Sequence, residues 1–360
     1  MDQSFSFSQN AWTRLKKNKG AMIGLCIIFL SFLTAISAYY ISTDSTPNAD
    51  RQIVEIQARK PGFTQLFLKE KKEKKTASTS FFKRLLYGAE DKNLYIPINS
   101  YHIDKDSVAI EKYIDEGVEE KQVFAKNVLP IKDFIASKTF WLGTDRFGRD
   151  ILSRLIIGVR VSLAVGLITV LISLSIGIFL GAIAGYFGGR LDNIIMWLIN
   201  VIWSMPILLL VFGITLALGK GFWQIFIAVG LTMWVNVARM IRGQVIALRE
   251  LEYIEAAKAL GLKDIRIILR HILPNVLGPV IVIAASNFAS AIIIEAGLSF
   301  LGVGVQPPMP SWGLMIKENY NFIITHNPIL ALAPGIAIMI LVLAFNLVGN
   351  GLRDALDVRG

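Results

Sequence analysis

Long apolar runs are the feature that most constrains how this chain can fold. A helix needs about 20 mostly apolar residues to cross the hydrocarbon core of a membrane. Soluble domains carry about 25% charged residues, whereas this chain is 54% hydrophobic and only 18% charged. We therefore predict an all-α membrane protein with about six spanning helices. The six candidate runs, each bounded by charge, glycine or proline, are Ala21–Tyr40, Val159–Tyr186, Asn193–Leu218, Phe222–Ile241, Val276–Leu298 and Ile329–Leu352.

The net charge of +10 could indicate a nucleic-acid partner, but the distribution of the charges argues against one. Of the 37 basic and 27 acidic residues, the polar stretch 41–152 holds 19 and 17. The other basic residues lie mostly beside the ends of apolar runs, as the positive-inside rule describes for membrane proteins. We expect contact with membrane lipid and none with nucleic acid.

Four basic residues, Arg14, Lys16, Lys17 and Lys19, precede the first run and place its start in the cytoplasm. This run is longer than a usual signal-peptide core and no small-x-small cleavage site follows it, so we expect it to be retained. Alternation of the spans then puts both termini in the cytoplasm. The predicted outer segments are 41–158, 219–221 and 299–328, and the predicted inner segments are 187–192, 242–275 and 353–360.

The long outer segment contains two kinds of pattern. Lys69–Lys75 is almost entirely charged, which indicates a solvated or mobile stretch. Tyr95–Ile98 and Val108–Ile114 flank a polar turn at Asp104–Ser107 and are typical of short strands in a hairpin. We therefore expect some β structure in an extracytoplasmic insertion over residues 41–140.

Small residues recur every four positions in the second run. Such a stripe either lets neighbouring helix backbones approach closely or reflects the high frequency of small residues in membrane helices. Under either interpretation the helix lies among others. The stripe consists of Thr169, Ser173, Gly177, Gly181 and Gly185.

The inner loop 251–275 is the most informative polar segment. Tyr253 to Leu260 is rich in helix formers, and Gly261 suits the left-handed conformation that ends a helix. Asp264 is placed to cap a second helix with opposite apolar and basic faces. We predict two short helices along the inner membrane surface. The apolar face of the second is Ile265, Ile268, Leu269, Ile272 and Leu273, and its basic face is Lys263, Arg266 and Arg270.

The sequence of this loop resembles the EAA…G…I-LP loop of bacterial ABC importer permeases. The residues that carry the resemblance are Glu255-Ala256-Ala257, Gly261 and Ile272-Leu273-Pro274. In that family the loop forms a coupling helix that docks into a groove on an ATP-hydrolysing subunit. The resemblance implies coupling through Tyr253, Glu255, Ala256, Ala257, Leu260, Gly261 and Asp264. The two alanines would allow close approach, and Glu255 offers a carboxylate.

The resemblance covers most of 140–360 and narrows to the C-type partner in the peptide and nickel permease group. Matching stretches are WLGTD at 141–145, GRD at 148–150, AGYFGG at 184–189, EAGLSFLG at 295–302, PMPSWG at 308–313 and NGLRDALD at 350–357. Trp197, Asn200 and Asn350 depart from residues that are common in the family, which are arginine, aspartate and aspartate. The outer loop is also longer than is usual there.

The resemblance implies a type I ABC importer fold in the cytoplasmic (inner) membrane. Its segments would be a cytoplasmic stretch 1–20, a first spanning helix 21–40, the insertion 41–140 and a permease core 141–360. It implies a heterodimer with a homologous permease, two ATP-binding subunits, a substrate-binding protein outside the cell and a peptide substrate. Nickel is the alternative substrate, although three scattered histidines and one cysteine offer no visible metal cluster.

The chain lacks a G-x-x-x-x-G-K-[ST] phosphate loop, so we expect no ATP hydrolysis by it and no cofactor on it. ATP and magnesium would belong to the partner ATPases. An ion-coupled secondary transporter is the rival class, but neither an inverted repeat nor intramembrane acids are evident. A membrane enzyme would need clustered acid, base or metal ligands within the spans.

Several polar residues within or beside the spans have two interpretations each. Pro206, after Ser204 and Met205, is expected to kink the third span and could open carbonyls toward a pathway. Glu295 either lines a gate or has a structural role at the interface. Asp145 and Asp150 are typical of helix starts. Asn236, Asn287 and Asn346 favour hydrogen bonds between helices, and Asn200 and Asn287 are also candidates for the pathway.

Overall fold

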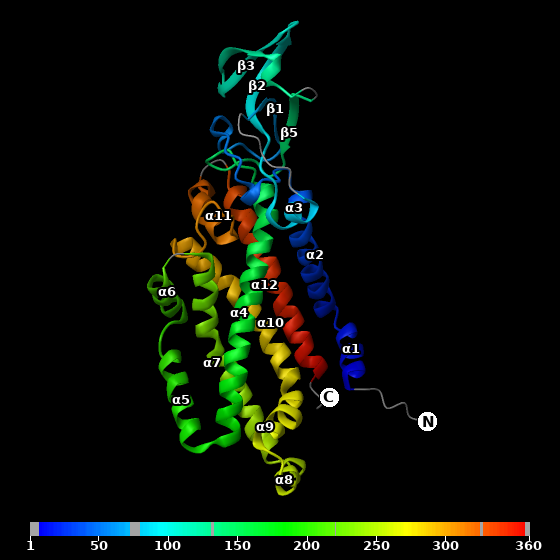
Figure 1. The fold of residues 1–360 in the computed structure, drawn as a ribbon, viewed down its shortest axis with the longest axis vertical. Helices are drawn as coiled ribbons and strands as arrows, with labels where there is room; N and C mark the ends of the chain where they lie inside the picture. The colour runs from blue at the N-terminus through cyan, green and yellow to red at the C-terminus, as the bar shows by residue number, and fades with distance from the viewer. Residues whose placement is uncertain (1–6, 73–79, 131–132, 220, 325–326, 357–360) are drawn as a thin grey trace, which may run out of the picture. The chain divides into compact units, whose positions relative to one another are not determined.

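A computed structural model describes residues 7–72, 80–130, 133–219, 221–324 and 327–356, and its chain divides into two compact units. Unit 1 comprises residues 1–31, 162–306 and 338–360, and unit 2 comprises residues 32–161 and 307–337. Three long helices contribute residues to both units, namely α2 (Lys19–Ile41), α4 (Ile151–Phe187) and α12 (Ile329–Leu356) (Figure 1).

The described part of unit 1 is helical. Its own elements are α1 (Phe7–Lys17), α5 (Gly189–Trp203), α6 (Ile207–Leu218), α7 (Phe222–Arg249), α8 (Glu252–Ala259), α9 (Asp264–Ile267), the π-helical turn η4 (Ile268–Ile272) and α10 (Leu273–Leu301). Within the described residues, five helical segments are long and apolar enough to cross a membrane, or six if the bent pair α5–α6 counts as one span. This confirms the predicted all-α membrane fold.

The small-residue stripe of α4 lies against α7. A Cβ added to Gly177 would come within 2.4 Å of the Val237 Cβ, and one added to Gly181 within 2.5 Å of the Ala238 carbonyl oxygen. Both distances are shorter than van der Waals contact, so no larger side chain fits without a shift of the backbones. Of the two interpretations of this stripe, the structure supports close helix approach.

The predicted third span, Asn193–Leu218, is not one straight helix. It breaks at residues 204–206 into α5 and α6, whose axes differ by 94°. Proline has no N–H to continue the hydrogen-bond ladder, and its ring clashes with the preceding turn. The kink expected at Pro206 is therefore confirmed, but it is a full break rather than a bend within one helix.

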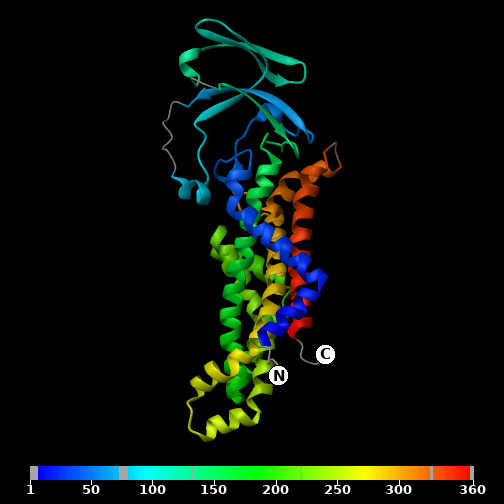
Figure 2. The same ribbon diagram turned by 90° about the vertical axis from the view of Figure 1, so that its right-hand side faces the viewer.

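Unit 2 contains a five-stranded antiparallel sheet of order β4-β3-β2-β1-β5 (Figure 2). The β2–β3 pair confirms the predicted hairpin. The strands are β1 (Phe63–Lys71), β2 (Asn93–Ile103), β3 (Ser107–Asp115), β4 (Val118–Ala125) and β5 (Ile135–Phe140), and the helices are α3 (Phe81–Tyr87) and α11 (Trp312–Asn319). Single 3-10 turns are η1 (Pro47–Ala49), η2 (Val54–Ile56), η3 (Lys126–Val128) and η5 (Tyr320–Ile323).

Strand β1 buries side chains on both of its faces. Phe67 joins a cluster with Ile53 and Ile56, and its neighbour Leu68 joins another with Ile98 and Leu129. Because successive side chains in a strand point to opposite faces, β1 contributes to a buried cluster on each face of the sheet. Of the stretch Lys69–Lys75 that was predicted to be solvated or mobile, Lys69–Lys71 forms the end of β1, where Lys69 and Glu70 are half-buried and Lys71 is exposed. Residues 73–75 lie outside the described residues.

Candidate functional site

The loop that follows α7 forms a short helix with a sharp end. Helix α8 ends at Ala259, Leu260 is its C-cap residue, and Gly261 adopts a φ of +76°. The Leu262 N–H donates to the Ala257 carbonyl at 3.2 Å and the Gly261 N–H donates to the Lys258 carbonyl at 2.9 Å. This bonding pattern is the Schellman motif, in which glycine takes the left-handed position at low steric cost. The predicted first helix and its glycine end are both confirmed.

Helix α8 has a buried side, which packs into unit 1, and an exposed side, which is called its outward side below. Ile254 and Ala257 are buried in one cluster with Val245, Ile267 and Ile272. Glu255 and Ala256 are exposed, and Leu260 is 82% exposed. Burial of an exposed leucine is worth about 1.5–3 kcal/mol, so the outward side offers an apolar contact beside a carboxylate. Of the two alanines that we expected at a docking surface, only Ala256 is on it.

A tyrosine at the end of α4 holds this loop in place. The Tyr186 hydroxyl donates to Asp264 Oδ1 at 2.6 Å, and its backbone carbonyl accepts from Arg249 at 3.0 Å. The Lys258 ammonium lies 5.1 Å from the centre of its ring. Tyr186 thus contacts residues from both sides of Gly261. The sequence contained it in the AGYFGG stretch without indicating this role.

The second predicted helix is not separate. Residues Asp264–Leu301 form one helical segment through the π-helical turn. Asp264 is the first helical residue and makes no cap bond, since its carboxylate binds Tyr186. Of the predicted apolar face, Ile272 is buried, whereas Ile265 and Leu269 are 68% and 58% exposed. A π-helical turn has more than 3.6 residues, so it rotates the faces relative to an α-helical projection.

A polar cluster joins α5 to α7 within unit 1. The Arg239 Nη2 donates to Asn200 Oδ1 at 3.1 Å, and its guanidinium carbon lies 3.7 Å from the centre of the Trp203 ring. The Trp203 indole N–H donates to Asn236 Oδ1, also at 3.1 Å. Asn200 was expected near a pathway. Arg239 and Trp203 were not singled out, because a single arginine in an apolar run carries no spacing signal.

A hollow of about 620 Å³ adjoins this cluster through Asn236. It is lined from α7, α10 and α12 by Asn236, Met240, Gln244, Pro279, Val282, Ile283, Ser286, Asn287, Arg353 and Leu356. Asn287 is buried and lies at hydrogen-bonding distance from Ser173. Ser204, Met205 and Pro206 are exposed at the α5–α6 break, and they do not line this hollow.

Glu295 is fully buried in α10 and accepts a hydrogen bond from Ser299 at 2.6 Å. The Ser299 oxygen in turn accepts from the Val305 N–H at 2.9 Å. These bonds tie the end of α10 to the turn after it. Of the two interpretations of Glu295, they favour the structural one.

In unit 2, the stretch before α4 is organised by buried charges. Arg149 binds Asp145 and Glu318, both at 2.6 Å, and lies 3.3 Å from Asp50. Burial lowers the pKa of Arg149, but attraction to Asp145 and Glu318 outweighs it and raises the pKa above its ordinary value. Asp150 accepts from the Ser153 N–H at 3.2 Å and so caps α4. The expectation of helix-start groups holds for Asp150, whereas Asp145 belongs to the ion-pair network.

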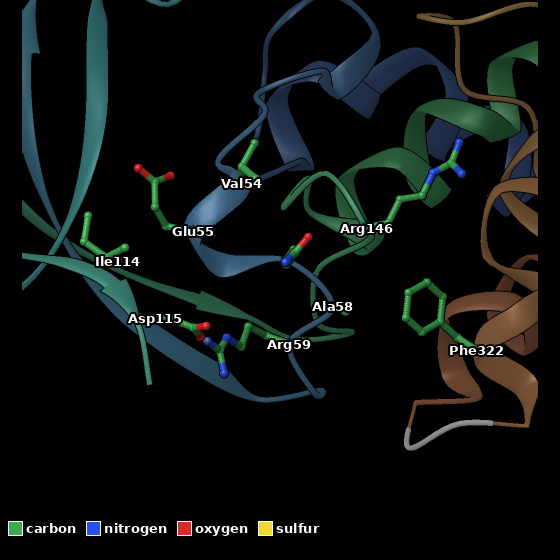
Figure 3. A pocket seen from close by; sticks show the side chains of 9 residues that line it. Val54, Glu55, Ala58, Arg59, Ile114, Asp115, Arg146 and Phe322 are labelled. Carbon is green, nitrogen blue, oxygen red and sulfur yellow. Dashed lines mark ion pairs between the residues drawn. The ribbon is translucent and has the colours of Figure 1, made fainter. Parts of the chain in front are cut away.

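A second hollow, of about 800 Å³, opens in unit 2 (Figure 3). Arg59 and Asp115 approach each other on one side of it, and Arg146 and Phe322 project from other segments. Three of its charged residues have ion-pair partners within the chain, since Arg59 pairs with Asp115 and Glu116 and Glu55 pairs with Lys112. This arrangement stabilises the loop and does not define a ligand.

Comparison with known proteins gives the class of this chain. The family described as "Binding-protein-dependent transport system inner membrane component" matches residues 177–359, about half of the chain. The chain belongs to this family, and it is a membrane-spanning permease rather than a catalytic subunit. Residues 6–61 match a second family, the N-terminal TM domain of oligopeptide transport permease C. This confirms the C-type resemblance indicated by the motifs.

Relatives cover both the core and the insertion. The dipeptide transport system permease protein DppC of Bacillus subtilis is 32% identical over 98% of this chain and 86% of its own length. The glutathione transport system permease protein GsiD of Pectobacterium atrosepticum is 43% identical over 61% of this chain and 73% of its own. An inward-facing MetNI methionine ABC transporter structure is 20% identical over 57% of this chain and 97% of its own, with a TM-score of 0.47.

Proposed function

We propose that this chain is the C-type permease of an ATP-driven importer of short peptides. It pairs with a homologous permease, and two ATP-binding subunits drive the pair. A substrate-binding protein delivers the peptide from outside. The names of the relatives support peptides, since they specify dipeptide, oligopeptide and glutathione transport. Nickel is the alternative substrate within this proposal.

The observation that carries this proposal is the outward side of α8. Glu255, Ala256 and Leu260 are exposed on a helix whose other side is packed into its own unit. An ATPase that binds this side can move α8, and the buried Ile254 and Ala257 transmit the motion to α7 and α10 as a rigid body. The proposed topology places α8 and both termini in the cytoplasm.

The test compares two glycines with the same backbone conformation. Gly261 and Gly117 have φ values of +76° and +77°, and an added Cβ meets no atom within 4 Å at either site. Alanine at either position therefore costs about the same, on the order of 1 kcal/mol. We expect Gly261→Ala to reduce ATPase co-purification and peptide uptake several-fold, and Gly117→Ala to leave both unchanged.

A charge reversal on α8 provides a second test of the coupling role. Glu255→Lys is expected to abolish ATPase binding, whereas Glu90→Lys, at an exposed acid of unit 2, should not. Wild-type binding and uptake in both Gly261→Ala and Glu255→Lys would refute the coupling role. Labelling of Glu255→Cys in a Cys26→Ser background tests the topology, and reaction with an impermeant reagent added outside intact cells would contradict it.

A further inference from the structure

Arg239 is a cation near the inner end of the predicted span Phe222–Ile241 on α7. It lies about 25 Å along the helix from Phe222 and about 3 Å from Ile241, at 1.5 Å per residue. A charge within a membrane helix is costly unless it meets water, a counter-charge or a polar cavity. The partners of the Arg239 guanidinium therefore indicate its role.

Among the described residues, only neutral groups contact this guanidinium. Asn200 accepts one hydrogen bond, Trp203 stacks on the plane, and the Nε atom is shielded from solvent without an acceptor. No carboxylate among the described residues forms an ion pair with Arg239, whereas Arg242, one turn further along α7, pairs with Asp192 at 2.5 Å. An arginine has five N–H donors in a planar fork that suits a carboxylate. One Nη2 donor binds Asn200 and Nε is shielded, so the Nη1 end of the fork is the part left for a ligand.

The hollow of about 620 Å³ adds no acidic competitor among its described lining residues. Asn236, which accepts from Trp203, lines this hollow, and the lining includes Arg353 and no acidic residue. The hollow is thus partly polar and carries one positive charge. The stacked indole fixes the plane of the guanidinium, so an incoming carboxylate would meet donors that are already oriented.

We propose that Arg239, with Asn200 and Trp203, binds the carboxylate of a peptide as it crosses the membrane. This inference rests on the proposed peptide-import function. Through this site the permease itself selects peptides that have a free C-terminal carboxylate, in addition to any selection by the substrate-binding protein.

The test measures uptake of a labelled tripeptide and of its C-terminal amide by vesicles that contain the complete transporter. The ratio of acid uptake to amide uptake is compared between variants, so the preference of the delivering protein cancels. We expect Arg239→Gln to lower this ratio by about tenfold, the effect of losing a charge-assisted hydrogen bond. Arg239→Lys should give an intermediate ratio, because it keeps the charge but not the fork.

Asn200→Asp tests the same site with the arginine retained. Its new carboxylate would occupy the guanidinium, so the ratio should fall as it does in Arg239→Gln. Arg190→Gln, an exposed arginine on α5, is the matched control and should keep the wild-type ratio. An unchanged ratio in both Arg239→Gln and Asn200→Asp would overturn the carboxylate site while leaving peptide import intact.

Two other outcomes are distinguishable from these. If Arg239→Gln no longer co-purifies with the partner permease, the arginine belongs to the subunit interface and the proposal is wrong. If the wild-type transporter imports neither peptide although its ATPases are active, the proposed function itself fails, and the site fails with it.

Discussion

Two arginines, one in each unit, occupy opposite chemical situations. Arg149 of unit 2 is 2% exposed and has carboxylates from Asp145, Glu318 and Asp50 within 3.3 Å. Arg239 of unit 1 has a neutral amide and an indole. A cation surrounded by its own acids is committed to holding segments together. A cation that lacks them retains the capacity to bind something else.

The contrast follows from where the acids lie in the sequence. Asp145 and Arg149 are four residues apart, and Glu318 comes from the end of α11, 169 residues from Arg149 in the chain. Near Arg239, the residue within hydrogen-bonding distance is Asn200, whose amide cannot neutralise a charge. The same side-chain type is thus structural in one unit and, in our proposal, a binding group in the other.

The largest expected effect is the loss of Arg149. Arg149→Met would leave Asp145 without its ion-pair partner, and Glu318 and Asp50 with only Arg154 at 3.5 and 3.8 Å, and should reduce the free energy of unfolding by about 3–5 kcal/mol. Arg239→Gln should cost less than about 1 kcal/mol, because it loses only one hydrogen bond and a partly exposed cation–π contact. Thermal unfolding in detergent measures both, with the exposed Arg146→Met as control. Equal losses of unfolding free energy in the Arg149 and Arg239 variants would contradict the difference between the two arginines.

The next largest effect is expected at the contact between α4 and α7, where substitution of glycine tests how tightly the helices of unit 1 pack. Gly181→Ala places a Cβ 2.5 Å from the Ala238 carbonyl oxygen and should cost about 1–3 kcal/mol. Gly243→Ala, on α7, meets no atom within 4 Å and should be neutral or stabilising by up to about 1 kcal/mol. The same unfolding assay compares them. A neutral Gly181→Ala would show that the helices separate more easily than the structure indicates.

The smallest effect concerns an unfavourable charge in unit 2. Burial and the nearby Arg51 lower the pKa of Lys138 to about 8. The charged lysine therefore destabilises the fold below pH 8, and this penalty disappears as the pH rises from about 8 to 10.5. Lys138→Met should raise stability at pH 7 by on the order of 1 kcal/mol and by less at pH 9.5. A gain that does not shrink with pH would contradict this origin. The acids near Lys138 are Asp44, Asp91 and Asp150.

Much of the site was visible in the sequence because it depends on local patterns. The EAA stretch and Gly261 predicted α8 and its end, since a helix and its glycine cap are decided within a few residues. The faces after Asp264 were not predictable, because the π-helical turn shifts them. The contacts of Tyr186 and Arg239 were not predicted from the sequence for a related reason. Their partners, Asp264 and Asn200, are 78 and 39 residues away in the chain.

The sequence by itself determined the class of the molecule and the location of its spans, because lipid demands long apolar runs whatever the neighbours are. It also determined the β2–β3 hairpin, whose turn is local. Only the tertiary structure decided which charges are neutralised within the chain, which alanine of the EAA stretch faces outward and how a 94° break divides the third span. Such outcomes depend on groups that are distant in sequence, and no local sequence pattern predicts that they come into contact.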